Sequence, residues 1–299
     1  MSSLTELPQI RYEDPLACIN WQAVDRECWW LPPRLLSLAG VPEFERLDER
    51  TRQRLSHLEY VHLLEAGLWL ESQFMARLAR LAHGCADVDR SARFLHELRE
   101  EAGHSLMFVE LLQRSGFGVC SRRGLGMRAV DLLGGLLSSR SALFWAMVVI
   151  GEELPDQLNR RLRRGVEEAI LSTVVYRIAA IHTRDEAMHC AFAREQCRQS
   201  AARSPAWQRA LLAPALSAAI DLYARYVYFP SVATYARAGL TPTRQWRALA
   251  LANPNRRVQV AHMLRPTLEF LIRSGWRVSS RYCPVRGASQ HAVGTRDDP

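Results

Sequence analysis

Three side chains that can bind a metal ion lie within eight residues of this 299-residue chain. They belong to the segment His182-Thr183-Arg184-Asp185-Glu186-Ala187-Met188-His189, in an alanine-rich stretch that favours a helix. At about 100° per residue, positions 182, 186 and 189 fall within roughly 60° of one another, so a helix presents all three on one face. Because His and Glu at helical spacing also occur on solvated faces that bind nothing, a metal site requires further ligands from other helices.

A second pair of candidate ligands lies upstream, in Glu101-Ala102-Gly103-His104. The Glu-x-x-His spacing places the two side chains one turn apart on the same helix face. The charged neighbours Glu97, Arg99 and Glu100 also fit an exposed turn, whereas the apolar residues around the motif give the helix a side that can be buried. This pair therefore needs support from the rest of the chain.

Two adjacent carboxylates, Glu152 and Glu153, directly follow an apolar run over residues 144–150. An ionised carboxyl group out of water is costly unless it is paired or bound to a metal, so we expect one of the two to be a ligand. The alternative is that the helix emerges into water at this point.

The first long helical segment offers three carboxylates. We favour Glu65, which lies between Leu64 and Leu68, over its rivals Glu59 and Glu71. With this choice the chain supplies, in order, a carboxylate, a Glu-x-x-His pair, a carboxylate and a second Glu-x-x-His pair. That is the arrangement of di-iron sites in four-helix bundles, and carboxylates with imidazoles suit iron. By spacing alone the additional His182 is either a further ligand or a buried core residue.

The elements that would position these ligands are helical. Apolar residues recur at spacings of three, four and seven over 47–82, and helical patterns continue over 89–115, 128–165, 166–200, 207–238 and 255–274. Gly116 suits a helix C-terminal cap, and Pro155, Pro214 and Pro230 are expected to kink or interrupt their segments. Because strand alternation of useful length is absent, we predict an all-α fold, a ferritin-like four-helix bundle with additional helices.

The length and the 48% apolar content predict one domain. Residues 1–46 are rich in Pro and Trp and are expected to form an irregular arm packed on the bundle. Residues 47–275 are expected to form the helical di-iron domain. Residues 276–299, where the apolar content collapses, are predicted to be a disordered tail.

Charge and cysteine content exclude several classes of protein. The net charge of +8 arises from Arg without any Lys, scattered among Asp and Glu, so nucleic-acid binding is not expected. Seven cysteines without a Cys-x-x-Cys pattern suit reduced thiols in the cytoplasm. Residues 1–14 lack the apolar segment of a signal peptide, and the apolar run 142–151 is too short to span a bilayer. We therefore expect a cytoplasmic protein without a membrane partner.

The combined ligand set resembles that of the AurF-like di-iron arylamine N-oxygenases, the p-aminobenzoate N-oxygenase family. The most specific part is the ending His-x-x-Asp-Glu-x-x-His, with its additional His, which is a signature of that group. The resemblance covers roughly residues 21–276, including the Leu-Pro-Pro stretch at 31–33. It implies a metal site made of Glu65, Glu101, His104, Glu152, His182, Glu186 and His189.

The resemblance also implies a homodimer that holds two iron ions and uses O₂ to oxidise an amine to a hydroxylamine, nitroso or nitro product in a biosynthetic pathway. It favours Glu152 over Glu153, because Asp156 follows one turn later. Asp156 and Asp185 then become candidates for orienting the ligating imidazoles. Pro155 is a departure from the family pattern, since it removes a backbone N–H beside the site.

The substrate pocket is expected on the apolar faces of these helices, although most side chains of this type are simply core. The candidates are Leu68, Trp69, Phe108, Trp145 and Val149. Since flavin, haem and iron–sulfur motifs are absent from the sequence, we expect an external reductase or redox protein to supply electrons. The alternatives to an N-oxygenase are a di-iron hydroxylase or oxidase acting at carbon, a non-enzymatic ferritin-like protein that handles iron or peroxide, and a helical interaction protein with a vestigial site.

Overall fold

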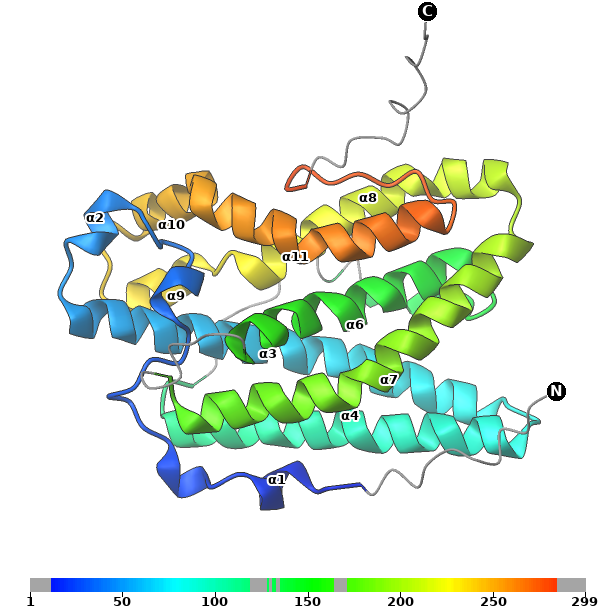
Figure 1. The fold of residues 1–299 in the computed structure, drawn as a ribbon, viewed down its shortest axis with the longest axis horizontal. Coiled ribbons are helices and arrows are strands. Elements are labelled where there is room, and N and C mark those ends of the chain that lie inside the picture. Colours follow the sequence, from blue (N-terminus) through cyan, green and yellow to red (C-terminus); the bar gives the residue numbers. More distant parts are fainter. Residues whose placement is uncertain (1–11, 119–127, 129–130, 133–134, 164–170, 284–299) are drawn as a thin grey trace, which may run out of the picture.

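Long helices make up most of the computed structural model, which describes residues 12–118, 128, 131–132, 135–163 and 171–283. The fold is all-α, and its centre is a ferritin-like bundle of four long helices (Figure 1). These helices are α3 (Glu49–His83), α4 (Val88–Ser115), α6 (Ala142–Arg163) and α7 (Thr173–Arg203). Helix α3 packs along α4, and α6 packs along α7, so the predicted fold class is confirmed.

Capping residues set the ends of the bundle helices. At the start of α3, Asp48 accepts a hydrogen bond from the backbone N–H of Thr51 at 2.8 Å, and Asp87 caps the start of α4 in the same way. Gly116 ends α4 at φ 64°, a left-handed conformation that glycine adopts without steric cost, as predicted. Pro155 and Pro214 lie inside α6 and α8 respectively, so neither interrupts its helix.

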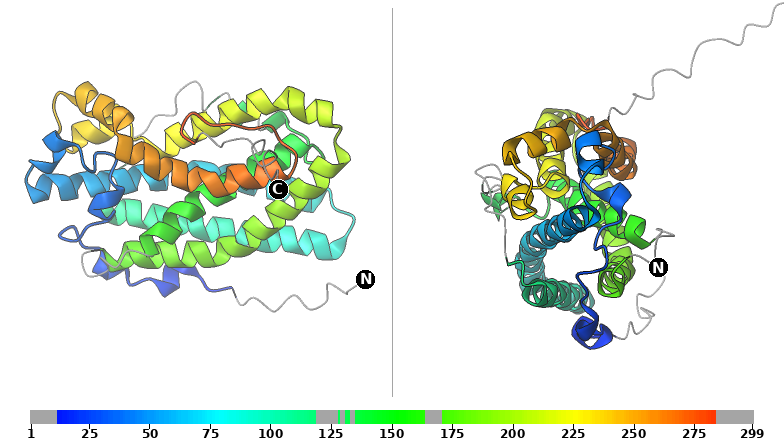
Figure 2. Two further views of the ribbon diagram at one scale, coloured as in Figure 1. Left: turned by 45° about the horizontal axis from the view of Figure 1, so that its top comes forward. Right: turned by 90° about the vertical axis from the view of Figure 1, so that its left-hand side faces the viewer.

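Four further helices follow the bundle: α8 (Ala206–Tyr228), α9 (Val232–Arg237), α10 (Thr243–Ala252) and α11 (Pro254–Arg273). Helices α8, α9 and α11 pack on α3 or α6 and form a second layer (Figures 1 and 2). The predicted segment 207–238 is thus two helices, with Pro230 between them. Among the described residues, Ala206–Arg237 is long and apolar enough to cross a membrane by length and composition, and 33% of its most apolar window is buried.

The N-terminal arm consists of short helical turns: α1 (Pro15–Cys18), η2 (Trp21–Ala23), η3 (Pro33–Leu35) and α2 (Pro42–Glu45). Trp29 and Trp30 are buried, and the Trp30 indole N–H donates to the Asp25 carbonyl at 2.8 Å. At the other end, Trp276 and Cys283 are buried in the core. The predicted disordered tail therefore begins too early, because these apolar side chains fix residues 276–283, while 284–299 lie outside the described residues.

Candidate metal centre

The four bundle helices bring seven buried side chains together in two groups that share one residue. In each group, one possible ligand atom from every residue lies within 4.8 Å of the others. The first group is Glu71, His104, His182 and Glu186, and the second is Glu101, Glu152, Glu186 and His189. Glu186 on α7 belongs to both groups, so it lies between two potential metal positions.

Helical periodicity accounts for the ligands that come from α4 and α7. On α7, His189 Nδ1 lies 3.3 Å from Glu186 Oε2, and His182 Nε2 lies 3.7 Å from Glu186 Oε1. On α4, His104 Nδ1 lies 3.2 Å from Glu101 Oε2. The spacings of three and four residues therefore place these side chains on the inward faces of their helices.

On α3 the structure replaces Glu65 by Glu71. Glu65 is buried but belongs to neither group, whereas Glu71 Oε1 lies 3.3 Å from His182 Nε2. The two positions are six residues apart, about 600° of rotation, so their side chains leave α3 roughly 120° apart. Glu59, the other rival, accepts a hydrogen bond from the Ser37 backbone N–H at 3.0 Å and so supports the N-terminal arm.

On α6 the structure distinguishes between two adjacent carboxylates. Glu152 joins the second group, while Glu153 accepts hydrogen bonds from Arg194 and, at 2.7 Å, from the Thr267 hydroxyl. Both carboxylates are buried, so α6 does not emerge into water at this point. Because neighbouring residues on a helix point about 100° apart, only one of them can face α7 and the cluster.

Each imidazole directs one ring nitrogen to the cluster and holds the other against a polar partner. The outer nitrogens are His104 Nε2, 3.4 Å from Asp185 Oδ2, and His189 Nε2, 2.9 Å from Glu100 Oε2. His182 Nδ1 lies 3.1 Å from the Asn159 side-chain amide. Such outer partners fix the orientation of the ring and hold its proton on the outer nitrogen, so the lone pair of the inner nitrogen is available to a metal ion.

The sequence anticipated some of these partners and missed others. Asp185 contacts His104, but Asp156 accepts a hydrogen bond from Arg160 at 2.6 Å instead of contacting an imidazole. Asn159 lies seven residues after Glu152, or two turns, so the spacing alone could have indicated that both face the cluster. Glu100 carried no such signal, because it directly precedes a ligand and resembled a surface charge.

Burial and mutual repulsion separate the carboxylates into two kinds. Burial, followed by the neighbouring Glu101, raises the pKa of Glu71 well above its usual value. Burial and the charge of Glu186 likewise raise the pKa of Glu152 well above its usual value. Burial opposes the ionisation of Glu101 and Glu186 as well, but hydrogen bonds and the His189 charge outweigh it and lower both pKa values.

The imidazoles differ in the same way. Burial lowers the pKa of His182 to about 4, so this ring is neutral. Burial would also lower the pKa of His104, but hydrogen bonds to Asp185 and Glu101 outweigh burial and raise it to about 9. The charges of Glu186 and Glu101 overcome burial at His189 and raise its pKa well above its usual value.

The donor set fits two divalent iron ions. Three buried atoms of the second group make no hydrogen bond of acceptable geometry, although they converge: His189 Nδ1 lies 3.2 Å from Glu101 Oε1 and 3.3 Å from Glu186 Oε2. Such converging buried atoms suit a site that receives a further ligand. The four carboxylates of the two groups carry four negative charges when ionised, which balances two divalent cations. Mixed carboxylate and imidazole donors are those that non-haem iron prefers.

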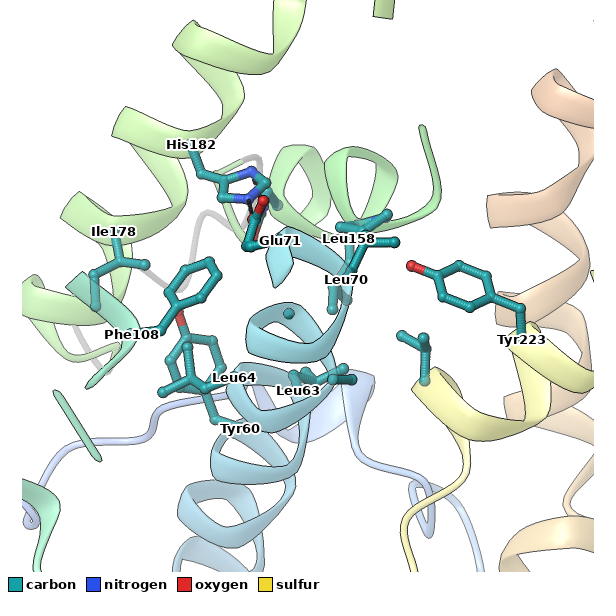
Figure 3. A pocket seen from close by; sticks show the side chains of 15 residues that line it. Tyr60, Leu63, Leu64, Leu70, Glu71, Phe108, Leu158, Ile178, His182 and Tyr223 are labelled. Carbon is teal, nitrogen blue, oxygen red and sulfur yellow. Dashed lines mark hydrogen bonds and ion pairs between the residues drawn. The ribbon is translucent and has the colours of Figure 1, made fainter. Parts of the chain in front are cut away.

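A cavity of about 50 Å³, which we call the inner cavity, lies directly beside the first group (Figure 3). Glu71 and His182 form its polar side, and apolar side chains such as Phe108 form much of the rest. The Phe108 ring stacks on His182, with ring centroids 5.6 Å apart and an angle of 20° between the planes. Among the predicted pocket residues Phe108 lines this cavity and Trp69 and Trp145 line neighbouring ones, whereas Leu68 and Val149 pack in the core.

A helical bundle whose core gathers carboxylates and imidazoles from all four helices defines the class of ferritin-like di-iron carboxylate proteins. Within that class, the chain belongs to the family of the p-aminobenzoate N-oxygenase AurF, whose family model matches residues 2–275. The match covers nearly the whole chain and includes all seven clustered side chains. The family is named for an N-oxygenase.

Similar proteins occur in mycobacteria. The chain is 26% identical over 221 residues to uncharacterized protein Mb0909 of Mycobacterium bovis, and equally to uncharacterized protein Rv0885 of Mycobacterium tuberculosis. The matched region covers 70% of this chain and 63% of each relative. The chain therefore spans less than two thirds of the length of these relatives, and their names assign no activity.

Proposed function

We propose that the protein is an O₂-dependent di-iron monooxygenase that oxidises the nitrogen of a small amine, and most favourably of an aryl amine. The observation that carries this proposal is the third imidazole. His182 lies 3.3 Å from Glu71 and borders the inner cavity, so it can hold a metal at the point where a substrate reaches the cluster. The common bundle pattern of carboxylates with two Glu-x-x-His pairs has no such residue.

The seven clustered residues would form two metal-binding positions. Glu71, His104 and His182 would hold one ion and Glu101, Glu152 and His189 the other, with Glu186 between them. Two bound iron ions would supply the activation of O₂ for the reaction R–NH₂ + O₂ + 2 e⁻ + 2 H⁺ → R–NHOH + H₂O. Further cycles would give the nitroso and nitro products.

Asn159 would control how His182 binds. With a metal on His182 Nε2, the proton must reside on Nδ1 and be donated outward. In the structure the Asn159 amide nitrogen lies 3.1 Å from His182 Nδ1, and a 180° rotation of the amide would bring its oxygen to this position, where it would accept that proton. The side chain thereby holds the imidazole in the tautomer that leaves Nε2 free for iron.

The cavity walls favour an aryl amine over an alkyl amine. An alkyl amine is protonated at neutral pH, and a buried apolar environment disfavours the charged form. An aryl amine is neutral under the same conditions and keeps the nitrogen lone pair that must accept oxygen. The Tyr223 hydroxyl points toward the cavity and can orient the amino group by a hydrogen bond (Figure 3).

We further propose that an external reductase or small redox protein supplies the two electrons, because the sequence carries no flavin, haem or iron–sulfur motif. In this proposal the protein acts as a homodimer in the cytoplasm.

Peroxide offers a direct test of the electron supply, since it delivers oxygen and electrons together. A protein that turns over with peroxide but not with O₂ alone would support dependence on an external donor.

The experiment supplies iron-loaded protein with a panel of anilines, a chemical reductant and isotopically labelled O₂, followed by mass spectrometry of the products. We expect one labelled oxygen on nitrogen in the hydroxylamine. Glu186→Gln, which removes the residue shared by both groups, serves as the inactive control. Label found at carbon with nitrogen untouched would replace this proposal by a carbon hydroxylase, and iron mineral without organic product would replace it by iron handling.

A further inference from the structure

A second and larger cavity, which we call the outer chamber, lies between α3, α6 and α8 and has a volume of about 440 Å³. The described residues that line it are apolar except for Gln73 and Arg77. Its lining includes Leu136, which is 75% exposed, and Ala215, which is also exposed. The outer chamber therefore opens to the surface beside these two residues.

Two smaller cavities that share lining residues lie in sequence between the outer chamber and the metal centre. Trp69, Leu70, Met147 and Ala219 line both the outer chamber and a connecting cavity of about 40 Å³. Leu70 and Tyr223 line both that connecting cavity and the inner cavity. Since the inner cavity is bordered by Glu71 and His182, the path from the surface ends at the candidate metal ligands.

Two side chains of α3 form the partition along this path. Gly151 of α6 lets α3 approach closely, because a Cβ at this position would lie 2.6 Å from Phe74 Cζ and 3.2 Å from Leu70 Cδ1. Phe74 and Leu70 thus pack directly on the residue that precedes Glu152. Phe74 also lines another small cavity that reaches Glu152. The Leu70 and Phe74 side chains therefore form part of the wall between the outer chamber and the cluster, together with the backbone of Gly151.

The sizes of the cavities indicate what each can hold. A buried apolar cavity of about 150 Å³ accommodates one benzene molecule. The inner cavity, at about 50 Å³, is too small for a ring, whereas the outer chamber has about three times the volume that benzene needs. Because the amino nitrogen of an aryl amine is bonded directly to the ring, the ring must lie beside the inner cavity with the Leu70 side chain displaced, and only the part beyond the ring can occupy the outer chamber.

We propose that the outer chamber binds the apolar body of the substrate, an aryl amine that carries a hydrophobic chain or further rings and is larger than a single small ring. This inference rests on the proposed function, because it takes the reacting group to be an amine. The amino end passes Leu70 toward Glu71, and the hydrophobic part displaces water from Phe74, Met147 and Ala219. The size of this body, and not a charge clamp, selects the substrate.

The test measures the affinity of iron-loaded protein for anilines with para-alkyl chains of increasing length, by calorimetry and by quenching of tryptophan fluorescence. Each buried methylene contributes enough transfer free energy to raise the affinity about two- to fourfold. Ala219→Phe fills the chamber, and Ala218→Phe, at an exposed neighbouring position outside the lining, is the matched control. We expect Ala219→Phe to weaken octylaniline binding at least tenfold and to abolish the dependence on chain length, with Ala218→Phe unchanged.

Ala215→Phe at the exposed mouth provides a second variant with little risk to folding, and it should also weaken the longer ligands selectively. Affinities independent of chain length, or equal effects of Phe at 218 and 219, would overturn the assignment of the chamber. Graded binding that Ala219→Phe removes, combined with no oxidation of any amine, would keep the chamber and refute the proposed function. The two failures are therefore distinguishable.

Discussion

Replacement of Glu71 by Gln tests the metal assignment most directly. Glu71 belongs to the first group alone, and Glu186 belongs to both. Without the Glu71 charge, two divalent ions leave one positive charge uncompensated in a buried site. An uncompensated buried charge costs about 3–5 kcal/mol, which corresponds to roughly 10²- to 10⁴-fold weaker binding. We expect Glu71→Gln to retain about one iron ion per chain instead of two, and Glu186→Gln to retain less than one.

The assay titrates metal-free protein with Fe²⁺ under anaerobic conditions in competition with a chelator and measures iron per chain. Glu65→Gln is the matched control on the same helix and should bind two ions. The high pKa of Glu71 keeps this carboxyl protonated in the metal-free protein, so the neutral amide should leave the unfolding temperature of that form unchanged. Loss of iron from Glu65→Gln, with two ions retained by Glu71→Gln, would refute the assignment on α3.

Three further predictions concern the groups around the centre. Asp185→Asn should weaken iron binding about 10- to 100-fold, because it removes the charge beside His104. Asp156→Asn, measured in the same chelator competition, should change the affinity for iron little, since Asp156 contacts Arg160. Equal effects of the two substitutions would contradict the assigned contacts. Burial lowers the pKa of His62 from 6.5 to about 4, so the stability that depends on a neutral His62 is lost as pH falls from 6.5 toward 4. Between pH 8 and pH 5 the unfolding free energy of the parent, measured by urea titration, should fall by about 2 kcal/mol more than that of His62→Gln. Parallel pH profiles of the two proteins would refute this prediction. Removal of iron by a chelator should lower the unfolding temperature, since Fe²⁺ at about 100 times Kd stabilises the folded protein by about 2.7 kcal/mol per site. An unfolding temperature that does not depend on iron concentration in calorimetry would argue against a metal site in the folded protein.

Helical spacing predicted which candidate ligands of one helix lie together. His182, Glu186 and His189 had to lie on one face once α7 formed, and the same holds for Glu101 and His104. Long helices were equally predictable, because their apolar patterns are strong and their ends carry Asp and Gly caps. This part of the fold depends on local rules that one sequence contains in full.

The choice among carboxylates on α3 was not predictable in this way. Apolar neighbours at Leu64 and Leu68 suggested Glu65, but α3 contacts α4, α8 and α9 and is therefore buried on several sides. On such a helix, apolar flanks do not identify the face that meets the metal ligands. Glu59 illustrates the difficulty, because it is fully buried and yet holds Ser37 in place. Only the arrangement of the neighbouring helices identifies Glu71.

The start of the tail and the interruptions expected at Pro155 and Pro214 were misjudged, whereas Pro230 lies between α8 and α9 as predicted. Pro155 and Pro214 lie within helices whose neighbours stabilise them. Residues 276–283 still contain four apolar side chains, and three of them, Trp276, Val278 and Cys283, are buried. The segment therefore keeps enough apolar contacts to be fixed on the core.

The opposed pKa values of the cluster make iron uptake an exchange of ions for protons. In the metal-free protein the raised pKa values favour protonated Glu71 and Glu152 and charged His104 and His189, and the lowered pKa values favour ionised Glu101 and Glu186, which balance the two imidazolium charges. Two divalent ions would displace these four protons and leave the net charge of the buried core unchanged. Loading therefore acidifies an unbuffered solution and becomes more favourable as pH rises. The interior remains electrically neutral in both states, which allows a pre-formed site to exist before the metal arrives.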